Sequence, residues 1–130
     1  MSRIFFTLVL MIAATNTLAR TLSEHEMREL LATSPVFEER EEQTVQWTLF
    51  NDGQVAAFSR WLLWTFSIQG SWQFKDGELC VTITPPDEAV EVMCGRFTHL
   101  EANRYRFDED DGEQIELFLI SSIDDAIAGD

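Results

Sequence analysis

Two cysteines, Cys80 and Cys94, are the residues whose type and spacing predict a specific chemical bond in this chain. Both lie between Gly70 and Gly95, a stretch that reads as three consecutive β-strands. An Asp76-Gly77 pair separates the first two strands and favours a tight hairpin turn, because both residues tolerate positive φ. A Pro85-Pro86-Asp87-Glu88 turn separates the second and third, so the cysteines fall on neighbouring strands.

The register of these two strands decides whether the cysteines meet. Matching their apolar faces places Val81 opposite Val92 and therefore sets Cys80 opposite Met93, one residue short of Cys94. A disulfide needs Cα atoms roughly 4.4 to 6.8 Å apart and converging side chains. We therefore predict a Cys80–Cys94 disulfide together with a β-bulge near the second cysteine.

The acidic run at positions 108–113 suggests calcium chemistry, but its spacing does not fit an EF-hand. If Gly112 were the sixth loop position, Phe107 and Phe118 would stand at the first and twelfth, where carboxylates are required. We interpret the run as a solvated turn. A looser calcium site at the tip of a hairpin is the alternative.

Other catalytic and metal-binding patterns are weak. His25 and His99 lie in different contexts, and the cysteines are expected to bond each other, so no zinc site is predicted. No local nucleophile signature such as G-x-S-x-G is present. We expect no cofactor and no enzymatic activity. A carboxylate pair suited to glycoside hydrolysis is the enzymatic alternative, since 23 acidic residues make chance pairs unavoidable.

The aromatic residues allow two interpretations. All four tryptophans fall between positions 47 and 72, with phenylalanines interleaved. They can simply fill the core of a small domain, because aromatic side chains bury a large area per residue. Alternatively, they form an apolar binding wall, for which the candidates are Trp61, Leu63, Trp64 and Trp72.

The first 19 residues predict export. Arg3 gives a positive end, residues 4–14 form an apolar run, and Ala19 supplies the small residue expected before a cleavage site, so residues 1–19 are a predicted secretory signal peptide. The apolar run would form a helix of only about 16 Å, against roughly 30 Å of membrane hydrocarbon. The expected location is therefore periplasmic or secreted, where a disulfide persists.

Length and charge limit the partners of the exported chain. Removing the signal leaves 130 − 19 = 111 residues, enough for one domain, and 8 of the 9 basic residues against 23 acidic ones, a formal charge of 8 − 23 = −15. Such a chain repels nucleic acid and anionic lipid headgroups, so neither nucleic acid nor, after signal removal, a membrane is an expected partner. A basic protein is favoured instead.

The mature chain begins with a predicted helix at about residues 24–32. Ser23 and Glu26 form a capping box, and Met27, Leu30 and Leu31 share one face. A helix this short is not stable alone, so its apolar face must dock on the rest of the domain.

The remaining sequence predicts eight or nine short strands joined by tight turns. We expect a mainly β fold, an antiparallel barrel or sandwich spanning residues 20–123, with the barrel preferred because nearest-neighbour turns dominate. A longer crossing connection, as in a Greek key, would have to lie between Arg60 and Gly70. Residues 124–130 have no anchor and are expected to fray.

These features together resemble small exported domains of unknown function in proteobacteria, which are calycin-like. The resemblance is carried by Gly70-Ser71-Trp72, Asp76-Gly77, Leu79-Cys80 and the second cysteine, and covers roughly residues 44–120. The G-x-W sequence is also similar to the first-strand motif of lipocalins, although here it lies on a middle strand. We expect a binding domain that holds a small apolar ligand or a protein through the aromatic wall. The alternative is an acidic inhibitor of a basic secreted enzyme such as a lysozyme.

Overall fold

The computed structural model describes residues 18–41, 44–61, 64–85 and 89–123, and for residues 60, 61 and 64–66 it describes the backbone alone. Most of the predicted signal peptide, the predicted tail at 124–130 and Leu63 of the predicted wall lie outside the described residues. In the part described, the chain forms one helix and nine strands. These are β1 (Arg20–Thr21), α2 (Glu24–Leu31), β2 (Pro35–Glu39), β3 (Val45–Leu49), β4 (Gln54–Trp61), β5 (Trp64–Lys75), β6 (Glu78–Thr84), β7 (Glu91–Glu101), β8 (Arg104–Glu109) and β9 (Gln114–Ser122).

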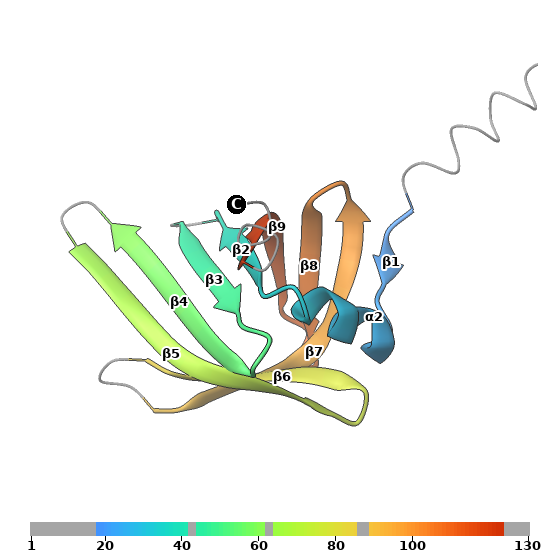
Figure 1. Cartoon of the computed structure of the whole chain (residues 1–130), viewed down its shortest axis with the longest axis horizontal. Coiled ribbons are helices and arrows are strands. Elements are labelled where there is room, and N and C mark those ends of the chain that lie inside the picture. The colour runs from blue at the N-terminus through green and yellow to red at the C-terminus, as the bar shows by residue number, and fades with distance from the viewer. Residues whose placement is uncertain (1–17, 42–43, 62–63, 86–88, 124–130) are drawn as a thin grey trace, which may run out of the picture.

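Strands β2 to β9 form a closed antiparallel barrel, one of the two architectures that the sequence predicts. Each strand pairs with the next along the chain, and β2 pairs with β9 to close the sheet (Figure 1). Strand β1 is an addition to this ring, because it pairs with Thr98 and His99 of β7. Closure removes exposed sheet edges, which explains why a short chain can bury one continuous core.

The connections are those of an up-and-down meander. Strands β4 and β5 pair antiparallel as far as Trp61 and Trp64, so the longer crossing connection considered for the Arg60–Gly70 region does not separate them. At the β5–β6 turn, Asp76 has φ 54° and Gly77 has φ 83°, which confirms the predicted hairpin turn.

The predicted register around the cysteines is wrong, although the predicted disulfide is confirmed. Cys80 and Cys94 are bonded directly across β6 and β7, with Cα atoms 4.0 Å apart. They pair in a regular ladder in which Val81 faces Met93, and no bulge interrupts these two strands. Val92 is 59% exposed because it shares the outer face with the cysteines. The inner face of β7 carries Met93 and Phe97, whose larger apolar area outweighs that of the valines.

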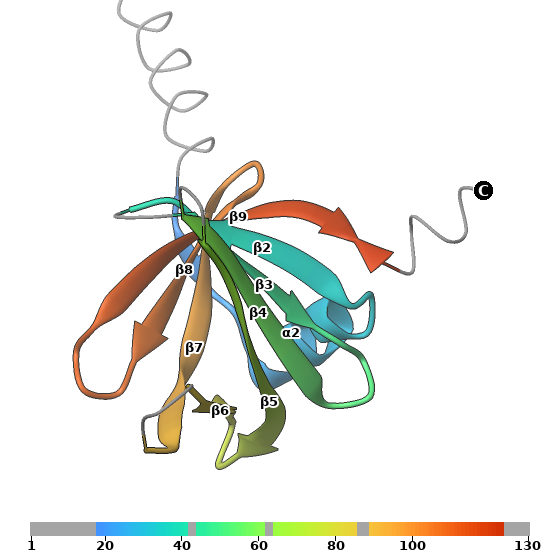
Figure 2. The same ribbon diagram turned by 90° about the vertical axis from the view of Figure 1, so that its left-hand side faces the viewer.

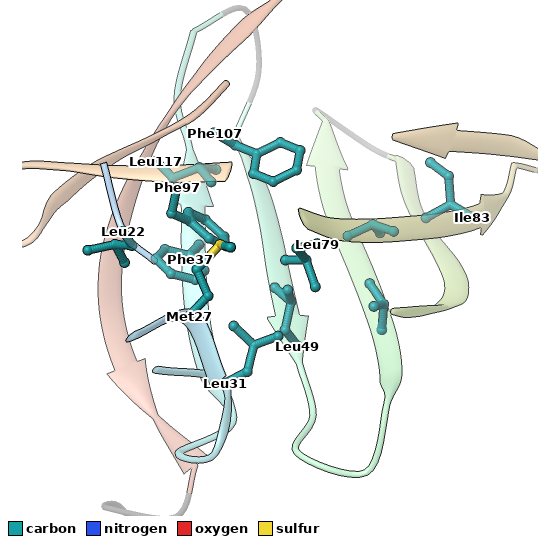
Figure 3. Packing of buried hydrophobic residues seen from close by; sticks show 12 residues of the cluster. Leu22, Met27, Leu31, Phe37, Leu49, Leu79, Ile83, Phe97, Phe107 and Leu117 are labelled. Atoms are coloured by element: carbon teal, nitrogen blue, oxygen red, sulfur yellow. The ribbon is translucent and has the colours of Figure 1, made fainter. Parts of the chain in front are cut away.

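Helix α2 lies across one end of the barrel, which we call the helix end. Its N-terminus carries the predicted capping box, with Ser23 and Glu26 exchanging side-chain to backbone hydrogen bonds. Met27 and Leu31 are fully buried, and Figure 3 shows them packed beside Phe37 and Leu49 of the barrel. The helix therefore closes this end with the apolar face that the sequence predicts.

At the other end of the barrel, which we call the far end, β2, β4, β6 and β8 end and β3, β5, β7 and β9 begin. In Figure 1 the far ends of β4, β5, β6 and β7 lie to the left and α2 to the right, and Figure 2 views the molecule from the left. Between the two ends, ring pairs such as Phe37–Phe97 and Phe97–Phe107 fill the interior, with centroids 5.3 and 5.2 Å apart. Over the residues described, no helix has the length and apolar character needed to cross a membrane.

Candidate binding site at the far end of the barrel

A small apolar cavity lies inside the barrel, and we call it the barrel cavity. Its volume is about 40 Å³. It is lined by Phe37, Trp47, Leu49, Val55, Leu79, Val81, Met93, Phe97, Phe107, Ile115 and Leu117. Typical ligand pockets measure roughly 300–1,000 Å³. Within the described residues, the interior is therefore mostly filled by side chains and has room only for a small apolar group.

Four glutamates lie two residues from cavity-lining residues, toward the far end, on four different chain segments. Glu39 follows Phe37 on β2, and Glu109 follows Phe107 on β8. On β7, which runs the other way, Glu91 precedes Met93, and Glu113 stands just before β9, two residues ahead of Ile115. Because successive side chains alternate between the faces of a strand, these positions continue the inner face. We call Glu39, Glu91, Glu109 and Glu113 the glutamate rim.

Pairing of the strands supports this placement. Glu91 pairs with Ile83 and Glu109 pairs with Gly95, two inner-face positions that are themselves buried. Gly95 lets β8 approach β7 closely, since a Cβ there would come within 2.0 Å of the Asp108 carbonyl oxygen. Glu109 itself is half-buried.

The electrostatics of the rim centre on Glu109. Burial raises the pKa of its carboxyl group, and the neighbouring carboxylates of Asp111, Glu113 and Glu91 raise it further. The carboxylate oxygens of Glu109, Asp111 and Glu113 can all lie within 4.8 Å of one another. Repulsion among these carboxylates therefore raises the free energy of the folded protein, and a positive group placed nearby would reduce that repulsion.

Two hydrogen bonds connect neighbouring segments on the β2–β4 side of the far end. The Trp47 indole donates from Nε1 to Oε1 of Glu39 over 3.0 Å, which ties a cavity-lining ring to a rim carboxylate. The buried Ser59 hydroxyl donates to the Thr44 carbonyl oxygen over 3.2 Å. The rim and the cavity wall are thus built from the same hydrogen-bonded strands.

The group Glu109, Asp111 and Glu113 is also the set of described residues that could supply ligands to a hard cation such as calcium. It coincides with the acidic run that the sequence analysis assigns to a solvated turn. Asp111 and Glu113 are exposed, and exposed acidic groups of this kind are common without a metal. The acid grouping alone therefore does not identify a metal site.

Among the described residues, no carboxylate is buried. The buried polar residues there are Ser34, Ser59 and Thr98. A glycosidase of the usual type needs one carboxyl group held protonated by its surroundings beside a second, ionised one. Two half-buried carboxyl groups have a raised pKa, Glu78 through a hydrogen bond with Asp110 and Glu109 through burial, but the carboxylates beside them are exposed.

The predicted aromatic wall is only partly described. Trp72 is half-buried in the core, where its Nε1 donates to the Phe50 carbonyl oxygen over 2.7 Å and its ring meets Phe74 edge-on at 5.7 Å. Trp72 therefore has a structural role near the helix end. For Trp61 and Trp64 only the backbone is described, and they pair with each other near the far end.

The glutamate rim is absent from the sequence-based site prediction. A signal for part of it was present, because Phe37-Glu38-Glu39 and Glu113-Gln114-Ile115 keep the alternation of their strands. Glu91 could not be found, because the apolar register placed Val90 and Val92 on the inner face instead.

The disulfide lies on the outer face of the barrel and takes no part in this site. Cys80 and Cys94 pair on the face opposite to Val81 and Met93. A structural disulfide indicates an oxidising, non-cytoplasmic compartment.

No family model, curated protein or solved structure matches this chain. A small β-barrel with a buried aromatic cluster is compatible with a binding domain.

Proposed function

We propose that this protein is an exported interaction domain that binds a positively charged protein at the glutamate rim. The observation that carries the proposal is the rim itself, in which four chain segments place a glutamate at the far end of the inner face. Carboxylates are normally scattered over the outer surface of a barrel, where water solvates each one. Gathering them at one end makes a local negative site within an already acidic chain.

Electrostatics supports a positively charged partner. The raised pKa of Glu109 reflects partial burial and repulsion from nearby carboxylates, and both costs fall when a cation approaches. The formal charge of −14 on the whole chain would also speed encounter with a basic protein. An inhibitor of a basic secreted enzyme such as a lysozyme is the specific form of this function that the charge favours.

A second function is favoured by the barrel cavity. Its lining is entirely apolar, so a small apolar ligand could occupy it. Mass spectrometry of the purified protein under native conditions tests this function. A retained apolar molecule would support it, whereas a ligand-free mass would favour the protein partner.

The proposed partner is tested by passing a periplasmic extract over the immobilised protein at low salt and eluting with a salt gradient. We expect basic proteins to be retained and released as salt screens the interaction. A lysozyme serves as a defined probe, measured by calorimetry at two salt concentrations. Retention that salt does not weaken would contradict an electrostatic function.

Export is proposed on the predicted signal at residues 1–19 and supported by the disulfide. The mass of the protein recovered from an exporting host measures it directly. We expect a mature chain that begins at Arg20 and is two mass units lighter than the reduced form. An intact N-terminus would contradict export by this signal.

A further inference from the structure

We propose that a groove on the outer face of strands β2 to β4, which we call the outer groove, takes an arginine side chain of the partner protein. The groove has a volume of about 210 Å³ and is lined by Glu38, Thr44, Gln46 and Phe58. Pockets for drug-sized ligands usually measure roughly 300–1,000 Å³, so this groove has room for a single side chain. The inference rests on the proposed function for the kind of partner, a positively charged protein, but it concerns a different face of the barrel.

The pairing of the strands explains how the outer groove forms. Gln46 of β3 stands opposite Phe58 of β4 on one side and Glu38 of β2 on the other. Trp47 and Phe37, their neighbours in the chain, line the barrel cavity, and successive side chains alternate between the faces of a strand. The row therefore lies on the outer face. Phe58 is 38% exposed there, so the groove offers an accessible aromatic ring on one side and a carboxylate on the other.

An arginine of the chain itself already binds the other side of Glu38. Phe118 of β9 stands opposite Glu38, and the guanidinium carbon of Arg40 lies 3.9 Å from the centre of the Phe118 ring. Arg40 Nε also donates to Oε1 of Glu38. A phenylalanine ring and this carboxylate thus hold one guanidinium together. Phe58 is the corresponding ring on the groove side, so the groove repeats the pairing of ring and carboxylate for a second guanidinium.

The chemistry of the groove favours arginine over other side chains. A planar guanidinium can stack on the Phe58 ring while its N–H groups, which point outward in its own plane, donate to Glu38 and to the Gln46 amide oxygen. A lysine ammonium group is more strongly hydrated and cannot stack. An acidic side chain would be repelled by Glu38. An aliphatic one would displace water from the polar groups of the groove without replacing its hydrogen bonds.

The outer groove lies at the same end of the barrel as the glutamate rim. Glu38 is directly followed by the rim residue Glu39, and Thr44 directly precedes the first residue of β3. The Thr44 carbonyl oxygen accepts the hydrogen bond of the buried Ser59 hydroxyl, which ties this part of the groove to β4. A basic partner at the far end can therefore place one arginine in the groove while other positive charges meet the rim.

The side-chain amide of Gln46 provides a direct readout. Its NH₂ signals can be followed in nitrogen-15 NMR spectra of the full chain, and Gln46→Glu assigns them. Gln73, exposed on β5 and paired with Cys80, serves as the internal control for general change. The ligand gives a second readout, because protons held over the face of an aromatic ring are shifted upfield.

The probes are three blocked tripeptides: acetyl-Gly-Arg-Gly-amide, acetyl-Gly-Lys-Gly-amide and acetyl-Gly-Leu-Gly-amide. We expect the arginine peptide to bind with a dissociation constant in about the millimolar range and to shift the Gln46 side-chain amide while Gln73 stays fixed. Its own side-chain methylene protons should move upfield. The lysine peptide should shift Gln46 less and keep its methylene signals in place, and the leucine peptide should produce neither change.

Two variants separate the aromatic ring from the carboxylate. Phe58→Leu keeps an apolar side chain but removes the ring, and we expect it to abolish the upfield shift and to weaken the arginine peptide about two- to fivefold. Glu38→Gln keeps side-chain size and should also weaken it about two- to fivefold. Glu29→Gln on the exposed face of α2 removes the same charge and should change the affinity less than about 1.5-fold.

The outcomes separate the two proposals. If the arginine peptide shifts the backbone amides of Glu91 and Glu109 but not the Gln46 side chain, the outer groove is overturned and the proposed function stands. If it shifts Gln46 alone, the groove stands and binding at the rim fails. If neither region responds, both fail. Equal Gln46 shifts with the lysine or the leucine peptide would show binding without selection for a guanidinium and would also overturn the inference.

Discussion

At the scale of single residues, the carboxyl group of Glu109 connects the stability of the barrel to its acidic end. Partial burial and three neighbouring carboxylates raise its pKa above the usual range. For an acid, a raised pKa in the folded state means that the folded protein binds protons more tightly than the unfolded chain. The free energy of unfolding therefore increases as the pH falls through this pKa, and the ionised carboxylate destabilises the fold at neutral pH.

The first prediction concerns Glu109→Gln, which removes this charge and keeps the side-chain size. We expect the variant to unfold at an equal or higher temperature than the wild type at pH 7, and to gain less on acidification toward about pH 5. Thermal unfolding followed by circular dichroism across this range measures both effects. Glu41→Gln, an exposed change outside the cluster, is the control. A clear loss of stability at pH 7 would show that the charge helps the fold.

The second residue-scale prediction concerns the disulfide. Cys80 and Cys94 are 14 positions apart, and closing a loop of that size restricts the unfolded chain. Replacing both with serine should lower the free energy of unfolding by about 3 kcal/mol. Urea unfolding of the variant, beside the wild type with and without a reducing agent, measures the loss. A loss below about 1 kcal/mol would mean that the fold scarcely depends on the bond.

At the scale of elements, tight strand packing depends on glycine at Gly70 and Gly95. A Cβ at Gly70 would lie 2.0 Å from the Thr82 carbonyl oxygen, closer than any real contact, so β5 and β6 could not keep their spacing. Because the obstructing atom belongs to the backbone, a side-chain rotation cannot relieve the clash.

Gly70→Ala should therefore destabilise the protein by roughly 1–3 kcal/mol, the range usual for overpacking in a core. Ser71→Ala, at the exposed neighbouring position, should change stability by less than about 0.5 kcal/mol. Chemical unfolding of both variants gives the comparison. Equal stability of the Gly70 variant and the wild type would show that the two strands can separate freely.

The elements also show what the sequence can predict. The helix start at Ser23 and the Asp76-Gly77 turn follow from local hydrogen-bonding groups and backbone freedom, so short-range reasoning finds them. The register of β6 and β7 is different, because it depends on which inner-face residues reach the shared core. Val90 and Val92 alternate like core residues, but Met93 and Phe97 fill the barrel instead.

The candidate site is less predictable for the same reason. A rim built from four separate segments becomes visible only when the barrel closes and the inner face of each strand is fixed. Glu91, for instance, changes face with a one-residue shift in register. The aromatic residues are prominent in the sequence, yet Trp72 serves the core through its bond to Phe50.

At the scale of the whole molecule, the barrel has two unlike ends. Helix α2 covers the helix end with Met27 and Leu31, whereas the glutamate rim lies toward the far end. The whole chain carries a formal charge of −14, so its electric field would attract a positively charged partner before that partner reaches the rim. The central claim is that the rim, and not the net charge alone, holds that partner.

The most direct measurement compares two quadruple variants in binding a hexalysine peptide at low salt by calorimetry. One variant changes Glu39, Glu91, Glu109 and Glu113 to glutamine. The other changes the outer-surface residues Glu24, Glu29, Glu101 and Glu116, so the net charge is the same. We predict that the rim variant loses about tenfold or more in affinity and that the outer variant loses less than about threefold. Equal losses would show that net charge alone attracts the peptide and would contradict the account.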